Sequence, residues 1–259
     1  MKKLTWILLL ALGVACRPDG PVFPIPNDLS QVPLRIKTIR QQASYGNPKT
    51  PNQNFTSVYR YDSLGRVVFI ENHWSNRNLE YQYQGDKLAA RLTYAFGKLI
   101  FHETFEYDAQ GKLTRLNWTG NGSLRVETFR YNADGQIGEV HSEFPNFNFP
   151  TKRVERYVWK NGNVVAINKF YGTGKPQSEW TYDYDSTINP YALTPADPDE
   201  PTSRNNLIRS TLKRDYIGNI DLAANPVIIR HVLKANGLPL RKSYNYDKRL
   251  ETFGYEARR

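Results

Sequence analysis

The stretch FEYDAQGKLTRLNW, residues 105–118, decides the fold because its skeleton recurs along most of the chain. The skeleton is an aromatic residue, a tyrosine two positions later, an aspartate, two loose positions, a glycine, a polar residue and an aliphatic residue. Related units begin at residue 59 (YRYDSLGRVVFI), 81 (YQYQGDKLAARL), 129 (FRYNADGQIGEV) and 157 (YVWKNGNVVAI), with weaker copies at 182 (YDYDSTINPY) and 232 (VLKANGLPLRK). A skeleton that recurs at nearly regular intervals along the chain predicts a repeated supersecondary unit.

Each unit is predicted to be one β-hairpin. Asp134-Gly135 and Asn161-Gly162 supply the residues that adopt positive φ angles in tight hairpin turns. Further turns, at residues 95–98 and 119–122, lie between successive units and predict an up-and-down antiparallel meander. The second aromatic residue of each unit is called its anchor here. The anchors are separated by 22, 24, 24, 28 and 25 residues, and they are Tyr61, Tyr83, Tyr107, Tyr131, Trp159 and Tyr184.

One face of these strands is predicted to be aromatic and the other polar. Residues two apart in a strand point to the same face, so each anchor shares its face with the aromatic residue two positions before it. Those partners are Tyr59, Tyr81, Phe105, Phe129, Tyr157 and Tyr182. The opposite face carries His102, Thr104, Glu106, Arg130 and Arg156.

The chain offers about 16 strands, most of them 7 to 10 residues long. Because open twisted sheets rarely exceed roughly ten strands, we expect this sheet to curl. The predicted fold is all-β, an antiparallel up-and-down hairpin meander rolled into a barrel-like or half-open sheet with its aromatic face buried. A membrane-spanning barrel is not expected, because charges fall mid-strand on the polar face, namely Glu106, Arg130, Arg156 and Lys169.

The N-terminus predicts export and anchoring. Residues 1–15, MKKLTWILLLALGVA, have the layout of a signal peptide, and LGVAC at residues 12–16 resembles a bacterial lipobox. We therefore expect lipidation of Cys16, a Pro-rich tether over residues 16–33 and a β domain over residues 34–259. The predicted location is the cell envelope, anchored to the outer membrane and facing the periplasm or the cell surface. Cys16 is the only cysteine, so no internal disulfide is possible.

The chain is basic, with a formal net charge of +10. Residues 204–259 hold 12 basic and 5 acidic side chains and carry most of this excess. One interpretation is a solvated set of strand faces, and the other is a cationic flank that meets anionic glycans or phosphate head groups. Nucleic acid is not an expected partner of an exported, anchored chain.

Motifs for metals and cofactors are absent from the sequence. The histidines, His73, His102, His141 and His231, show no metal-ligand spacing, and there is no nucleophile elbow, phosphate loop or dinucleotide fingerprint. The sequence predicts no metal, no cofactor and no catalytic residue.

Three glutamates are candidate ligand-facing residues. Glu103, Glu127 and Glu155 each precede an anchor by four residues and so share the aromatic face. In-register hairpins would place such carboxylates about 9–10 Å apart, near the separation found in inverting glycosidases. Alternatively, these carboxylates lie where the face of the sheet meets solvent, or they pair with strand neighbours such as Arg115.

The aromatic residues allow two interpretations, a buried core, which we favour, or an exposed platform for sugar rings. Trp118 and Trp180, nearer to strand ends, are the better candidates for exposure and for facing a ligand. The proline-rich loop over residues 186–207 interrupts the hairpins and carries several acidic residues. We expect solvent exposure of this loop rather than calcium binding.

YRYDSLGRV, FEYDAQGKL and FRYNADGQI resemble YD repeats, the units of Rhs-type shell proteins. Together with the lipobox, YDYDSTINPY at residues 182–191 and RNNLI at residues 204–208, they resemble a family of uncharacterised bacterial lipoproteins with a porin-like β-fold. This resemblance implies an antiparallel barrel or half-barrel and brings no active-site residues with it.

The expected function is that of a non-enzymatic, lipid-anchored envelope module that binds a partner, most plausibly a glycan. One alternative is an accessory lipoprotein that binds another envelope protein through sheet edges or hairpin tips. Another is a glycan-active enzyme that uses Glu103, Glu127 or Glu155.

Overall fold

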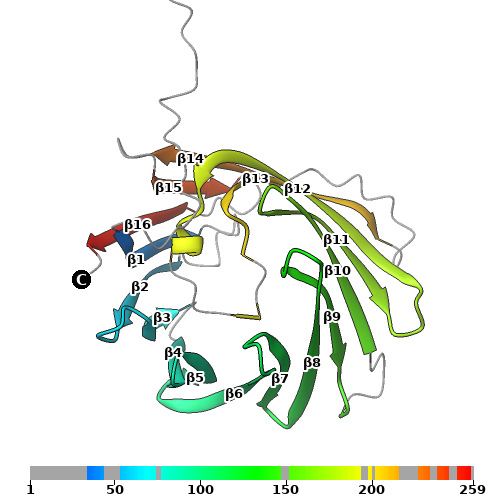
Figure 1. Ribbon diagram of the computed structural model, residues 1–259. Helices are drawn as coiled ribbons and strands as arrows, with labels where there is room; N and C mark the ends of the chain where they lie inside the picture. Colours follow the sequence, from blue (N-terminus) through cyan, green and yellow to red (C-terminus); the bar gives the residue numbers. More distant parts are fainter. Residues whose placement is uncertain are drawn as a thin grey trace, which may run out of the picture.

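Sixteen antiparallel strands form a closed barrel in which each strand pairs with its neighbours in sequence and β1 closes on β16 (Figure 1). The structure is a computed structural model that describes residues 34–43, 53–73, 77–146, 152–193, 198–199, 202–215, 227–233, 238–244 and 250–257. The predicted all-β meander is confirmed, and the sheet is closed rather than half-open. The predicted signal peptide, Cys16 and the tether lie outside the described residues.

The strands are β1 (Leu34–Ala43), β2 (Gln53–Tyr61), β3 (Val67–His73), β4 (Arg77–Gln84), β5 (Lys87–Ala95), β6 (Lys98–Tyr107), β7 (Leu113–Gly120), β8 (Ser123–Tyr131), β9 (Ile137–Glu143), β10 (Lys152–Lys160), β11 (Asn163–Tyr171), β12 (Pro176–Ile188), β13 (Asn205–Asp215), β14 (Val227–Leu233), β15 (Pro239–Tyr244) and β16 (Leu250–Ala257). A short 3-10 helix, η2 (Pro190–Leu193), follows β12.

The hairpin turn explains the spacing of the aspartate and the glycine that recurs from unit to unit. In the turn between β2 and β3, the Asp62 carboxylate accepts hydrogen bonds from the backbone N–H groups of Leu64 (3.0 Å) and Arg66 (2.9 Å). Gly65 takes a φ of 78° and donates its N–H to the Asp62 carbonyl. Asp108 and Asn132 cap the next equivalent turns in the same way. The aspartate and the glycine of the repeat are therefore turn chemistry.

Each of these hairpins also contains a β-bulge beside its anchor. Tyr61 pairs with Val67, whereas Tyr59 pairs with Ile70, so the three residues 59–61 oppose the four residues 67–70. The same register shift occurs in the hairpins β4–β5, β6–β7, β8–β9 and β10–β11. Because of the bulge, residues three apart on the second strand both point inward. Bulges also increase local twist, which helps a sheet to close.

The anchors link each hairpin to the preceding one. The Tyr83 hydroxyl donates to the Val67 carbonyl (2.9 Å), and the Tyr131 hydroxyl donates to the Leu113 carbonyl (2.9 Å). We call these hydrogen bonds the anchor bonds. The remaining ones join Tyr61 to Ile36, Tyr107 to Leu88, Trp159 to Ile137 and Tyr184 to Val164. Tyr255 on β16, which the sequence pattern did not include among the anchors, makes an equivalent bond to Pro239 on β15, and we count it with them.

At several anchors, a cationic side chain also packs on the aromatic ring. The Arg66 guanidinium lies 4.2 Å from the centre of the Tyr83 ring, and the Arg35 guanidinium lies 3.8 Å from that of Tyr61. The ammonium of Lys112 lies 5.2 Å from the Tyr131 ring. Arg66 and Lys112 each follow the glycine of their repeat and pack on the anchor of the next hairpin, which is a favourable cation–π arrangement.

The aromatic face lines the inside of the barrel and forms its core. Tyr59, Tyr81, Phe105 and Phe129 are buried, and the anchors pack against them. The interpretation of the aromatic residues as core is thus the one that the structure supports. Because these aromatic residues remove a large apolar area from water, their cluster is the main stabilising feature.

The outer wall carries ion pairs together with some exposed apolar side chains, such as Val158 and Val232. Arg60 pairs with Glu71 (2.7 Å) and Arg156 pairs with Glu139 (2.8 Å), both on the outer face. The prediction that Lys169 shares this face was wrong, because its ammonium points inward to Glu155. The bulge in β11 shifts the alternation and explains the error. In the described part of the chain, no helix has the length and apolarity needed to cross a membrane.

Candidate functional site

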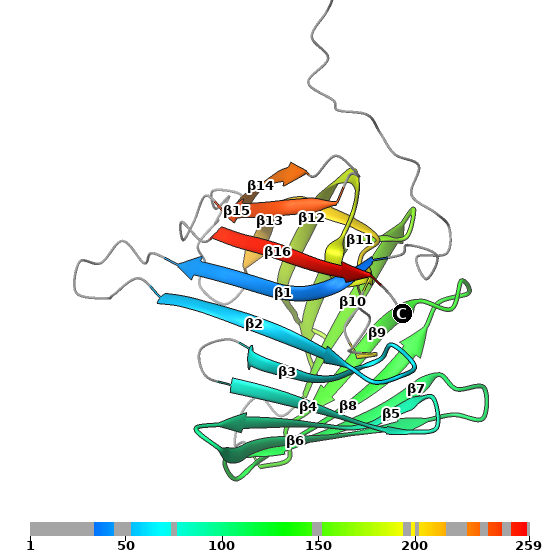
Figure 2. The ribbon, with the colours of Figure 1, turned by 90° about the vertical axis from the view of Figure 1, so that its left-hand side faces the viewer.

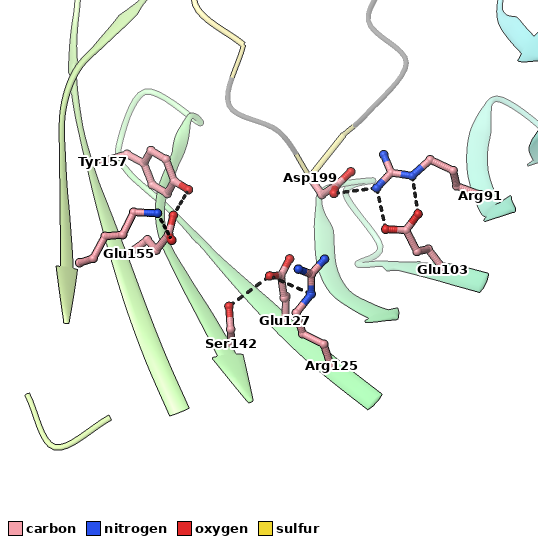
Figure 3. Close-up of polar contacts among 9 residues, drawn as sticks. Arg91, Glu103, Arg125, Glu127, Ser142, Glu155, Tyr157 and Asp199 are labelled. Atoms are coloured by element: carbon pink, nitrogen blue, oxygen red, sulfur yellow. Dashed lines mark hydrogen bonds and ion pairs between the residues drawn. The ribbon is translucent and has the colours of Figure 1, made fainter. Parts of the chain in front are cut away.

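A belt of charged and polar side chains lies on the inner wall across strands β5 to β11 (Figure 3). We call this set the charged belt, and its members are Arg91, Glu103, Arg125, Glu127, Ser142, Glu155 and Lys169. All three glutamates expected on the aromatic face lie there. Each one contacts a cation from its own or the neighbouring strand.

Arg91 and Glu103 form the most buried pair of the belt. They are direct cross-strand partners on β5 and β6, with Nε–Oε2 and Nη2–Oε1 distances of 2.5 and 2.7 Å. Their side chains are only 11% and 6% exposed. Asp199, from the segment after β12, contacts the same guanidinium at 3.3 Å. This bidentate geometry satisfies both charges in a site with little water.

The other two glutamates are held in a similar way. Glu127 lies 3.4 Å from Arg125 Nε and accepts a hydrogen bond from Ser142 Oγ (3.1 Å). Glu155 receives the Lys169 ammonium at 2.6 Å and the Tyr157 hydroxyl at 2.9 Å. Burial, together with the Glu155 carboxylate, raises the pKa of Tyr157 well above its ordinary value.

This geometry bears on the two interpretations of the glutamates. An inverting glycosidase needs one carboxyl free to donate a proton, another free to activate water, and an open cleft between them. Here each carboxylate is paired with a strand neighbour. The prediction of Arg115 as one of their partners was nevertheless wrong, because Arg115 lies on the outer face near Glu106.

The segment between β12 and β13 turns into the barrel (Figure 1). We call residues 189–193, 198–199 and 202–204 the lumenal segment. Leu193 is buried against Leu238, and the Tyr191 ring meets Phe253 edge-on at 5.9 Å. Asp199 reaches Arg91 on β5, which places this segment across the lumen.

The lumenal segment is also fixed to the wall at its return to β13. Ser203 Oγ accepts the Val164 N–H at 3.0 Å and donates to the Tyr184 hydroxyl at 2.8 Å. The expected solvent exposure of loop 186–207 was therefore wrong for most of its described residues, although Ser186 and Thr202 are exposed. A barrel of this many strands encloses more space than wall side chains fill, so an inserted segment takes it up. Asp197 and Glu200 lie outside the described residues.

A second polar row lies on the inner wall of β14, β15, β16 and β1. His231, Lys242, Glu251 and Gln41 are successive cross-strand partners. The buried Glu251 carboxylate accepts hydrogen bonds from Gln41 (3.2 Å) and from Tyr191 (3.4 Å) of the lumenal segment. Burial lowers the pKa of His231 below its usual value, and its Nε2–H donates to the Leu207 carbonyl.

In the basic C-terminal region, the described residues Arg209, Lys213, Arg230 and Arg241 are exposed on the neighbouring strands β13 to β15. The ammonium of Lys242 lies 5.7 Å from the Tyr191 ring inside the barrel. Arg209, in contrast, pairs with Asp183 on the outside.

The two tryptophan candidates are half-buried on the inner wall. Trp118 lies 4.7 Å from the Phe101 ring and 5.6 Å from the Arg125 guanidinium. Trp180 is opposite Ile167 on β11. Neither ring forms part of an open outer platform. Among the described residues, no group of three or more histidine, cysteine, aspartate or glutamate side chains is placed to hold a metal ion.

Sequence reasoning missed Arg91, Asp199 and Glu251. Arg91 had a detectable signal, because the equivalent position in the other hairpins, three residues after the first inward aliphatic residue, is apolar. Those equivalents are Ile70, Leu116, Val140 and Ile167. A charge in a core position of a repeat indicates a buried partner. Asp199 had no such signal, because its contact crosses the lumen.

No protein-family model and no curated protein matches the chain. The solved structures that are similar to it include two porin-like proteins. A porin-like protein from Bacteroides uniformis aligns with a TM-score of 0.54 and 11% identity over 85% of this chain and 98% of that chain. A porin-like protein from Bacteroides vulgatus aligns with a TM-score of 0.56 and 14% identity over 86% of this chain and 98% of that chain. The chain has the barrel fold of these porin-like proteins.

Proposed function

We propose that this protein is a non-enzymatic β-barrel of the cell envelope that binds a glycan on its rims or outer wall. The observation that supports this proposal is the occupied lumen. The aromatic face is core, the three candidate glutamates are paired with cations, and the lumenal segment crosses the interior. Binding surfaces are then left to the rims and the outer wall.

The proposal includes a lipid anchor on Cys16. Its support is the lipobox-like LGVAC and the apolar run before it. The ion pairs on the outer wall fit a domain that stands in water beside a membrane, with the lipid as its attachment. Metabolic labelling with a palmitate analogue tests this part. Labelling is expected for the full-length chain and not for Cys16→Ser, and equal labelling of the two would contradict it.

Glycan binding is tested with the full-length protein in detergent micelles on an array of neutral and anionic glycans. Signal for at least one glycan class, retained in the Cys16→Ser variant, is the expected result. Retention in that variant separates binding by the barrel from adhesion of the lipid. Background signal for every glycan would reject the glycan part of the proposal.

A second candidate function, an accessory protein that binds another envelope protein, is favoured by two exposed apolar turn residues. Leu64 and Phe96 are 74% and 85% exposed at hairpin tips at opposite ends of the barrel. Cross-linking in cells, followed by identification of the linked protein, tests it. One reproducible partner that is lost in Leu64→Ser or Phe96→Ser would favour this function over glycan binding.

A further inference from the structure

Strands β1 and β2 part before they reach the rim that carries the β2–β3 turn. Their pairing runs from Ala43–Gln53 to Thr38–Val58 and does not continue in the described residues of the two strands. Beyond that point, Arg35 pairs with Glu256 on β16, while Tyr59 pairs with Ile70 on β3. Figure 2 shows the two strands diverging toward this rim. The wall therefore has a split, which the Tyr61 hydroxyl bridges to the Ile36 carbonyl.

The split contains a pocket of about 670 Å³, which we call the seam pocket. Its lining includes Arg35, Lys37, Tyr59, Arg60, Asp62 and Glu256. Ligand pockets commonly measure about 300–1,000 Å³, so this volume suits a ligand of one to a few sugar rings. Unlike the lumen, the seam pocket lies at the surface.

The carboxylates of the seam pocket are already paired. Glu256 is held by Arg35 at 2.9 Å, and Asp62 is held by Arg66 at 2.6 Å and by the backbone of its own turn. The Arg35 guanidinium in turn covers the Tyr61 ring. These contacts make one wall of the pocket fixed, polar and nearly neutral.

Two cations of the pocket are held more weakly. The Lys37 side chain is 59% exposed, and its ammonium lies 4.0 Å from the nearest Glu256 oxygen. The Arg60 side chain is 61% exposed and pairs with an exposed carboxylate, Glu71. Because ion pairs between exposed side chains contribute little free energy, both cations are available to an anionic ligand.

We propose that the seam pocket binds a saccharide that carries a carboxylate or a phosphate group. Lys37 and Arg60 hold the anionic group, and the paired carboxylates and Ser63 on the pocket wall accept hydrogen bonds from sugar hydroxyls. The inference rests on the proposed binding function and names its site and ligand class. The anionic sugar has two sources, a free acidic polysaccharide or the phosphorylated head group of a glycolipid.

The test measures binding by calorimetry to the full-length protein in detergent micelles. The probes are trigalacturonate, glucose 1-phosphate and, as the neutral control, maltotriose. The variant Lys37→Gln/Arg60→Gln removes the two available cations. Lys152→Gln/Arg209→Gln is the matched control, since these residues are 61% and 55% exposed, form ion pairs on other strands and remove the same charge.

Wild-type protein is expected to bind an anionic probe at least tenfold more tightly than maltotriose. The Lys37/Arg60 variant should weaken that binding at least tenfold, and the control variant should change it less than twofold. Preference for trigalacturonate over glucose 1-phosphate assigns a free acidic polysaccharide as the source, and the reverse preference assigns the phosphorylated head group of a glycolipid.

Three results would overturn the inference. They are no binding of either anionic probe by the wild type, equal loss in both variants, and unchanged binding in the Lys37/Arg60 variant. Glycan-array signal that persists in the Lys37/Arg60 variant would reject the seam pocket and leave the proposed glycan binding intact. Array signal at background would reject both.

Discussion

The hydroxyl of Tyr107 donates a 3.0 Å hydrogen bond to the backbone carbonyl of Leu88, which belongs to the preceding hairpin. Leu88 is buried, so its carbonyl depends on this donor for part of its hydrogen bonding. The same relationship recurs along the wall wherever an anchor bond is found. It joins neighbouring repeats through side chains in addition to the strand ladder.

Tyr107→Phe removes one anchor bond and keeps the ring. We expect the free energy of unfolding to fall by about 1–2 kcal/mol, because a buried carbonyl loses its partner. Tyr94→Phe is the control, since its hydroxyl contacts Glu80 on the outer wall, where water can replace it. Urea denaturation measures both variants, and an equal loss in the two would contradict the role of the anchor bond.

The barrel should lose stability in alkali. Burial raises the pKa of Tyr107 and of Tyr182 to about 12, from a usual value of 10.0. In the unfolded chain these phenols ionise near pH 10, so the folded state holds its protons longer. Their stabilising contribution is complete below pH 10 and is lost as the pH rises to about 12.

Absorbance of phenolate at 295 nm, compared between wild type and Tyr107→Phe, isolates the titration of Tyr107. A midpoint near pH 10 for the missing component would show that this phenol titrates like an exposed one. Urea denaturation at pH 9, 10.5 and 11.5 gives the accompanying decline in the free energy of unfolding.

The buried trio of Arg91, Glu103 and Asp199 should be far more sensitive to the loss of one member than to joint replacement. Arg91→Ala leaves two carboxylates without their shared cation, and we expect destabilisation of about 3–5 kcal/mol. The combined variant Arg91→Met/Glu103→Leu/Asp199→Asn should recover most of that loss. A triple variant as unstable as Arg91→Ala would mean that the charges themselves, rather than their pairing, maintain the fold.

Gly120 is required by a close approach between strands. A Cβ at this position would lie 2.2 Å from Phe101 Cδ1 and 2.4 Å from the Ile100 carbonyl oxygen. Gly120→Ala should therefore displace the Phe101–Trp118 ring pair and destabilise the barrel by about 1–3 kcal/mol. Gly138→Ala is the control, because its Cβ would meet its nearest neighbour at 3.4 Å. Tryptophan fluorescence should report the displacement in the first variant only.

The local structure could be predicted from sequence because its causes are local. The Asp62 and Gly65 of one turn, and the aromatic residues Tyr59 and Tyr61 beside it, are specified within a few positions of each other. The placement of Glu103, Glu127 and Glu155 on the inner face followed from counting back from each anchor. In these cases the alternation of a strand was enough.

Other features depend on distance across the barrel. Closure requires Arg35 of β1 to meet Glu256 of β16, 221 residues later, and no periodicity specifies that pairing. The inward path of the lumenal segment depends on the width of the lumen. The inward direction of Lys169 was missed because a bulge interrupts the alternation that the prediction assumed.

Every anchor bond in the described residues has its donor in the later strand and its acceptor in the earlier one. When a hairpin leaves the ribosome or an export channel, the earlier strand that carries its acceptor carbonyl has therefore already emerged. Because each of these junctions joins an aromatic side-chain donor to a backbone carbonyl, gain or loss of a whole hairpin during evolution would change the circumference without requiring a new kind of contact. Barrels of different width could therefore arise from different numbers of one repeated hairpin.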